Sequence, residues 1–195
     1  MTPLVREVLM MPPGCRSREA ASFVAQLEDQ SERLRADTRG LTAAGLEWQP
    51  SPGLNTIGML LAHIAIVEVF WTQVGPLGLT SDDVRRADMH TALGIGIDDD
   101  GMPLAPGGAP PATLRGKDLA YFDDLLARAR RYSMRDIAQL GDTDLDREIT
   151  RTRRDGSIHQ SNMRWILYHM VEHFAGHYGQ INLLAHQFRL TGGGA

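Results

Sequence analysis

The stretch from Asn55 to Gly75 constrains the fold more than any other part of the chain. It contains TIGMLLAHIAIVEVFWTQV, in which apolar residues face almost every side of a helical wheel. We predict a helix over residues 55–75, with Asn55 as its N-cap and Gly75 followed by Pro76 as its end. A helix that is apolar on every side has to be covered by other elements, so we expect it to be the most buried part of the protein.

Three further segments carry apolar residues at helical spacing. They cover about residues 17–39, 118–140 and 161–190, and Gly141 is expected to end the second of them. A chain of 195 residues with 43% hydrophobic residues suits one domain with a full core. The four segments together predict an all-α chain that folds as a single domain over residues 1–195.

The second and third predicted helices are joined by residues 76–116, a link of about forty residues. Most links between neighbouring helices are short, so one this long either crosses over the fold or builds a lid, and the sequence leaves both alternatives open. We expect one helical turn near residues 82–90. The acidic run Asp98, Asp99, Asp100 lacks the ligand spacing of an EF-hand loop, and we interpret it as a solvated turn.

A short alternating segment precedes the last predicted helix. REITRTRRDGSIHQS, residues 147–161, alternates as a strand does on both sides of Asp155-Gly156, which is a strong two-residue turn signal. We therefore predict a small β-hairpin. Its basic residues are expected to be solvated rather than to form a phosphate-binding patch.

Composition and charge argue against several partners and compartments. The net charge of −4 and the pI near 5.9 argue against a broad nucleic-acid surface, since phosphate binding relies on clustered Lys and Arg. No uninterrupted apolar run is long enough to cross a bilayer, and the N-terminal stretch lacks the features of a signal peptide. Cys15 is the only cysteine, so an intrachain disulfide is excluded, and the cytoplasm is the expected compartment.

Histidines are concentrated in the last predicted helix. Four of the seven in the chain fall in YHMVEHFAGHYGQINLLAH, residues 168–186. At about 100° per residue, His173 and His177 lie inside the apolar stripe of this helix, whereas His186 faces solvent. His63, on the most apolar helix, also points into the protein. A buried imidazole needs a hydrogen-bond partner or a metal, because leaving its nitrogens unpaired costs a few kcal/mol.

Two interpretations of the buried histidines stay open at this point. They are either hydrogen-bonded core residues or ligands of one metal ion. His173 and His177 stand one turn apart and can both reach the same ion, and His63 on a facing helix would complete three nitrogen ligands. Such a set leaves one coordination position open, as in catalytic zinc sites, although three imidazoles also suit nickel, iron or copper.

We first interpret the polar and aromatic residues near the histidines as structural. Glu68 and Glu172 lie about 140° and 100° around their helices from the nearest candidate ligands, so neither is expected to act as a general base. Gln180 lies on the histidine side and either orients a ligand or a bound water, or fills the end of the helix packing. Trp71 and Trp165 are expected to pack in the core, with a place in a pocket wall as the alternative.

The stretches LEWQPSPGLNTIGMLLAHIAIVEVFW and MRWILYHMVEHFAGHYGQINLL resemble the DinB/YfiT-like superfamily of metalloenzymes. The resemblance spans nearly the whole chain in the order of its elements, and it implies a four-helix bundle with an up-down-down-up arrangement. It also implies a divalent metal held by three histidines. The family motif falls on His63 and on HxxxHxGQ, which supplies His173, His177 and Gln180. His169 is not a motif ligand and is expected to lie near the metal or in the pocket.

The superfamily includes S-transferases and isomerases that use low-molecular-weight thiols such as mycothiol, bacillithiol or glutathione. The resemblance therefore implies a homodimeric, metal-dependent enzyme acting on a small molecule, with zinc or nickel favoured and iron as a third choice. Water at rest, and a thiolate or a substrate oxygen during turnover, would bind the metal, and no catalytic side chain is assigned. Tyr178 stands where many members carry Arg, so the usual contact from this position to an acidic cofactor group is not expected.

The resemblance leaves two other functions open. One is a metal-dependent hydrolase, in which the ion lowers the pKa of a bound water to about 7. The other is a non-catalytic module that binds a metal or a small ligand during stress. A roomy polar pocket beside an open metal position would favour catalysis, whereas a closed fourth ligand would favour a structural role.

Overall fold

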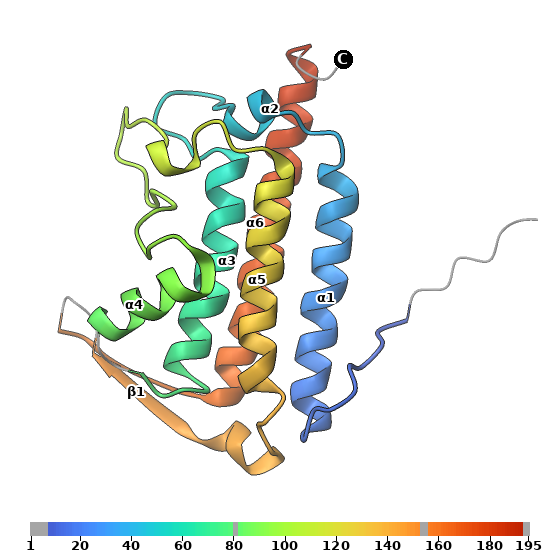
Figure 1. Ribbon diagram of the computed structural model, residues 1–195, viewed down its shortest axis with the longest axis vertical. Helices are drawn as coiled ribbons and strands as arrows, with labels where there is room; N and C mark the ends of the chain where they lie inside the picture. Colours follow the sequence, from blue (N-terminus) through green and yellow to red (C-terminus); the bar gives the residue numbers. More distant parts are fainter. Residues whose placement is uncertain (1–7, 80–81, 153–155, 193–195) are drawn as a thin grey trace, which may run out of the picture.

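A computed structural model describes residues 8–79, 82–152 and 156–192 of the chain (Figure 1). In these residues the chain is mostly helical, as predicted, and the expected hairpin is present. The helices are α1 (Arg18–Thr38), α2 (Ala43–Glu47), α3 (Ile57–Val74), α4 (Asp82–Leu93), α5 (Leu119–Ile137) and α6 (Met163–Leu190). The remaining elements are two 3-10 helices, η1 (Ala112–Leu114) and η2 (Asp142–Asp146), and the strands β1 (Glu148–Thr152) and β2 (Ile158–Asn162).

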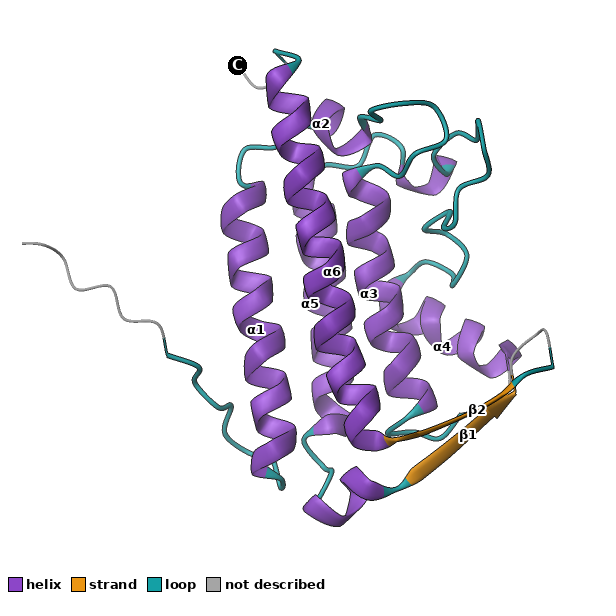
Figure 2. Ribbon diagram, turned by 180° about the vertical axis from the view of Figure 1, so that it is seen from behind, coloured by secondary structure: helices purple, strands orange, loops and turns teal. Residues whose placement is uncertain are grey.

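The four long helices α1, α3, α5 and α6 lie side by side, with the hairpin across one end and α2 at the other (Figures 1 and 2). In Figure 1, α1 and α6 run upward, whereas α3 and α5 run downward. Helix α3 packs against α5 and α6, and α1 packs mainly against α6. The candidate ligands on α3 and α6 are therefore brought together by direct contact between their two helices.

Helix α3 is the most apolar element of the fold. It is long and apolar enough to cross a membrane by length and composition alone, with a mean hydropathy of 1.7, but 83% of it is buried inside the protein. Burial against neighbouring helices accounts for this composition. Its N-cap is Thr56 and not Asn55, since the Thr56 hydroxyl accepts a hydrogen bond from the Met59 backbone N–H at 3.1 Å.

Other element ends also differ from expectation. Helix α5 ends at Ile137, and Gly141 instead precedes η2, where its backbone N–H donates to an Asp144 carboxylate oxygen at 2.8 Å. Helix α4 is longer than the single turn expected for this part of the link. The short helix α2 was not predicted, and the Thr42 hydroxyl caps it.

The hairpin pairs β1 and β2 antiparallel, with Arg151 opposite His159 and Glu148 opposite Asn162. The first half of the predicted Asp155-Gly156 turn lies outside the described residues. Asn162 ends β2 and also caps α6, because its side-chain oxygen accepts from the Trp165 backbone N–H at 2.9 Å. The hairpin therefore leads directly into the helix that carries most of the histidines.

A buried ion pair joins α3 to α5 inside the helix packing. Glu68 and Arg130 are only 4% and 8% exposed. The Arg130 guanidinium donates from Nε to Glu68 Oε1 at 2.7 Å and from Nη2 to Glu68 Oε2 at 3.2 Å. Ser133 also donates to Glu68 Oε1, at 2.5 Å. Glu68 is thus structural, as expected, and not a base at the histidines.

Candidate metal centre

Three of the predicted residues, His63, His173 and His177, meet between α3 and α6. The Nε2 atom of His173 lies 3.1 Å from Nε2 of His63 and 3.1 Å from Nε2 of His177. One ligand atom from each of the three lies within 4.8 Å of the others. The two helices therefore direct three imidazole nitrogens at a common point.

The outer nitrogens of two of these rings have hydrogen-bond acceptors. His63 Nδ1 lies 2.7 Å from a carboxylate oxygen of Asp100, and His177 Nδ1 lies 2.9 Å from the side-chain oxygen of Gln180. Both partners accept, so each Nδ1 carries the proton and each Nε2 presents its lone pair to the common point. This is the tautomer in which a histidine binds a metal through Nε2.

The donor set fits a cation. His173 Nε2 faces the lone pairs of His63 Nε2 and His177 Nε2. It carries at most one proton, so it can donate a hydrogen bond to only one of these two nitrogens. Imidazole nitrogens bound at 2.0–2.1 Å to one tetrahedral ion lie about 3.3 Å apart, close to the 3.1 Å found here. An ion at the common point would use all three lone pairs and leave a fourth position for another ligand.

The protonation of the rings also suits metal binding. Burial, together with the neighbouring His177, His63 and His169, lowers the pKa of His173 to about 3. Burial also lowers the pKa of His177. Both rings are consequently neutral at neutral pH, and the neutral imidazole is the form that coordinates metals.

Asp100 is the site residue that sequence reasoning missed. It was expected in a solvated turn, but it is only 3% exposed and contacts His63 from the long link. Its second carboxylate oxygen accepts from the Met102 backbone N–H at 3.0 Å, which fixes the carboxylate. The chain reverses at Gly101, whose φ of 69° favours glycine, and this reversal directs Asp100 inward while Asp98 stays exposed.

The link therefore contributes directly to the site. After α4 it runs back along the length of α3 to the end of the molecule where α5 begins (Figure 1). Asp100 is the point at which it reaches the histidines. No sequence pattern identified this contact, since the run of three aspartates marks a turn without saying which of them points inward. A long link beside a histidine-bearing helix is the signal that could have suggested it.

His169 lies one turn before His173 and outside the three-nitrogen cluster. Its ring stacks on Trp165, with centroids 4.8 Å apart and planes 8° from parallel, and meets Trp71 edge to face at 5.2 Å. Its Nδ1 lies 3.3 Å from a Glu172 carboxylate oxygen. The ring centroid is 5.8 Å from that of His173. His169 thus connects the histidine cluster to two indole rings.

Both indoles line a cavity. Trp71 is partly buried and also packs against the core, as expected, whereas the pocket-wall alternative fits Trp165 better. Trp165 is 43% exposed, which excludes a core position for it. The cavity has a volume of about 220 Å³ and lies between α3, α6 and the hairpin.

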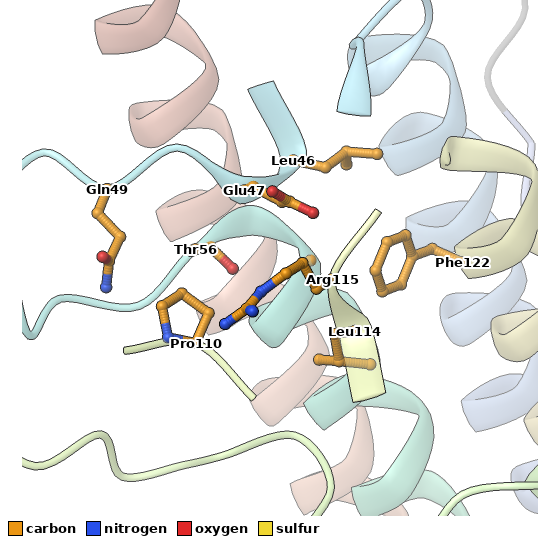
Figure 3. Close-up of a pocket in the computed structure, with 9 residues that line it drawn as sticks. Leu46, Glu47, Gln49, Thr56, Pro110, Leu114, Arg115 and Phe122 are labelled. Atoms are coloured by element: carbon orange, nitrogen blue, oxygen red, sulfur yellow. The ribbon is translucent and has the colours of Figure 1, made fainter. Parts of the chain in front are cut away.

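A second cavity, of about 160 Å³, lies towards the α2 end of the fold (Figure 3). Figure 3 shows Arg115, Thr56 and Gln49 among its lining side chains, with Phe122 at one side. None of the predicted site residues lines it.

Tyr178 takes part in the contact between α6 and α1. Its hydroxyl donates to the Asp37 carboxylate, which also accepts from Asn182 at 3.3 Å. Exposed His186 faces solvent, as expected. Tyr178 and Asn182 attach α6 to α1 and leave the opposite side of the helix to the three clustered histidines.

Comparison with known proteins gives one family match. A family model described as mycothiol-S-transferase matches residues 22–189. The matched region includes all three clustered histidines, Asp100 and Gln180. No curated protein matches the chain.

Proposed function

Because the chain belongs to the mycothiol-S-transferase family, we propose that it is a metal-dependent enzyme. In this proposal it joins a low-molecular-weight thiol to a small electrophile, or isomerises a small molecule with the help of such a thiol. The observation that carries this proposal is the convergence of three imidazole nitrogens on one point. The family match supports the thiol as co-substrate, and the donor set supports the metal.

His63, His173 and His177 are the proposed metal ligands, and zinc or nickel suits them best, with iron as a third choice. A bound divalent ion would lower the pKa of a thiol, so that the nucleophilic thiolate forms at neutral pH. Asp100 holds the ring of His63 in the metal-binding tautomer, and Gln180 does the same for His177. His169 is proposed as a pocket residue beside the metal.

The carboxylates near the cluster favour thiol transfer over hydrolysis. A metal-dependent hydrolase generally needs a base that reaches the attacking water. Among the described residues, Glu68 is paired with Arg130, Glu172 contacts His169, and Asp100 faces the outer nitrogen of His63. None of the three faces the common point. A non-catalytic metal-binding module is the second alternative. The cluster found among the described residues has three ligands, which would leave a fourth position for a substrate, and this argues against that alternative.

We further propose that residues 1–195 form one domain, the up-down-down-up four-helix bundle of the DinB superfamily. The directions of α1, α3, α5 and α6 support this arrangement. A cytoplasmic homodimer acting on small molecules, without nucleic-acid or membrane partners, agrees with the family resemblance and with the net charge of −4.

The proposed reaction is tested by incubating protein loaded with zinc or nickel with mycothiol and 1-chloro-2,4-dinitrobenzene. We expect a thioether product whose formation requires the thiol, stops after chelation and returns when metal is added back. Bacillithiol and glutathione in parallel reactions identify the preferred thiol. Product formation at the uncatalysed rate with every thiol, from protein that demonstrably holds metal, would contradict the transferase proposal.

Replacing Asp100 by alanine is expected to weaken metal binding by about 10- to 100-fold, the usual effect of removing the partner of a ligand histidine. The loss follows because His63 would no longer be held in one tautomer and orientation. Competition with a chromophoric chelator measures the dissociation constant. Asp98→Ala, an exposed change two residues away, serves as the control. Equal affinities in the two variants would exclude a role for Asp100 at the metal.

A further inference from the structure

Helix α6 has one long apolar side that faces solvent. Figure 2 shows this helix in front of the other long helices. Four large apolar residues of α6 are between 43% and 74% exposed: Trp165, Tyr168, Leu183 and Leu190. Two of them stand near the start of the helix and two near its end. Their exposure in a single chain indicates a surface that another molecule covers.

The middle of the same side carries two glycines that the fold does not require. A Cβ added to Gly176 or Gly179 would meet nothing within 4 Å in the described part of the chain, and neither residue has a positive φ. Glycine inside a helix costs roughly 0.5–1 kcal/mol relative to alanine. No contact within the chain offsets this cost. The two glycines leave a flat place on α6 where a second helix backbone can approach closely.

The exposed side has the spacing of a helix–helix interface. Positions 165, 169, 172, 176, 179, 183, 186 and 190 follow one another at alternating steps of four and three residues, which is a heptad repeat. All of them except His169 are exposed. This spacing keeps one line of side chains directed at a second helix along its whole length. We call these eight positions the α6 seam.

The α6 seam is complementary to itself when two copies run antiparallel. Its positions are symmetric about the point midway between residues 177 and 178, so each position faces another position of the seam. Gly176 then faces the partner's Gly179, and Trp165 faces the partner's Leu190. The small residues meet at the centre, and the large apolar residues cover one another at the ends. A two-fold dimer requires a self-complementary patch of this kind.

The size and charge of the seam also suit a second copy. A helix of 28 residues is about 42 Å long and about 10–12 Å wide with its side chains, a footprint of roughly 450 Å². This value is close to the roughly 500 Å² per copy that a specific interface needs. The seam carries one carboxylate and no Lys or Arg. That carboxylate, of Glu172, contacts His169 of its own chain, so like charges do not oppose the pairing.

We propose that a second copy of this chain docks antiparallel on the α6 seam and forms one wall of the site at the histidine cluster. This inference rests on the homodimer of the proposed function. His169 is a member of the seam, and its ring centroid lies 5.8 Å from that of the proposed ligand His173. The pairing places the partner's His186 opposite His169. Each copy therefore contributes a side chain beside the metal centre of the other.

Sedimentation velocity tests the seam through the mass of the particle. The wild-type protein should sediment as a dimer at micromolar concentrations, with twice the 21.5 kDa mass of the chain. The double variant Gly176→Gln, Gly179→Gln should sediment as a monomer, because its two side chains fill the space where the backbones meet. It should fold, since the added Cβ atoms meet nothing in the described chain, and circular dichroism checks this. Ala120→Gln adds the same side chain at an exposed position of α5 and should stay dimeric.

Cysteine cross-linking tests the antiparallel register. In a Cys15→Ser background, the double variant Glu172→Cys, Leu183→Cys should form a disulfide-linked dimer on oxidation with diamide, because position 172 faces the partner's position 183. Along one helix these positions lie about 16 Å apart, too far for a disulfide within the chain. Each single variant should stay unlinked, because its two copies of the cysteine are separated by the same distance. Parallel pairing would instead link each single variant.

The outcomes separate this inference from the proposed reaction. A dimer that persists in the glycine variant, without the cross-link between positions 172 and 183, would overturn the seam and assign the dimer to another surface. A glycine variant that stays dimeric but no longer binds mycothiol would also overturn it, since the glycines would then make room for the thiol. A monomeric wild-type protein with transferase activity would overturn the interface and leave the reaction standing. The expected dimer and cross-link, in a protein without transferase activity, would support the interface and contradict the reaction.

Discussion

Replacing both His63 and His173 by alanine is expected to remove the bound metal almost completely. The parent protein should contain about one equivalent of a transition metal per chain, because three imidazoles form one tetrahedral site with an open position. The double variant keeps His177 as its one remaining ligand from the cluster. Elemental analysis of protein purified without a His tag or added metal measures the difference.

His186→Ala is the matched control, because this histidine is on the same helix but faces solvent. It should retain the metal content of the parent protein. Far-UV circular dichroism shows whether the double variant is folded. Equal, negligible metal in the parent and the double variant, even after incubation with zinc, nickel and iron, would mean that the three histidines are packed core residues.

The histidine cluster was predictable because it depends on local periodicity. Two histidines four residues apart on a helix stand one above the other whatever the rest of the fold does. The expectation that His63 points into the protein followed from the apolar residues around it on its own helix. The structure places these three side chains together, as the helical wheels indicated.

Asp100 was not predictable by the same reasoning. It contacts a histidine 37 residues away, and this contact depends on the path of an irregular link. No periodicity describes such a path, and three consecutive aspartates look alike in the sequence. The exposure of Trp165 was missed for a related reason. A helical wheel gives the direction of a side chain but not whether a neighbouring element covers it, and the hairpin leaves Trp165 43% exposed.

Glu68→Ala is expected to lower the free energy of unfolding by about 3–5 kcal/mol, the usual cost of removing one partner from a buried ion pair. Arg130 would lose the buried carboxylate that accepts two of its hydrogen bonds and would keep only the ion pair with Glu28, which is 43% exposed. Urea denaturation measures the change. Asp124→Ala removes an exposed ion pair, with Arg128 four residues along α5, and should cost less than about 1 kcal/mol.

The double variant Glu68→Met, Arg130→Met decides what the buried pair contributes. Removing both charges together leaves no unpaired buried ion, because Glu28, whose carboxylate lies 3.1 Å from Arg130 Nη1, is 43% exposed and is solvated when Arg130 is removed. This variant should therefore be close to the wild type in stability or somewhat more stable. A cost for the double variant as large as that of Glu68→Ala would contradict this account and assign the loss to packing. Metal content should stay unchanged in all three variants, since neither residue contacts a clustered histidine through a hydrogen bond. A loss of metal with Glu68→Ala alone would mean instead that the ion pair positions α3 against α6 at the site.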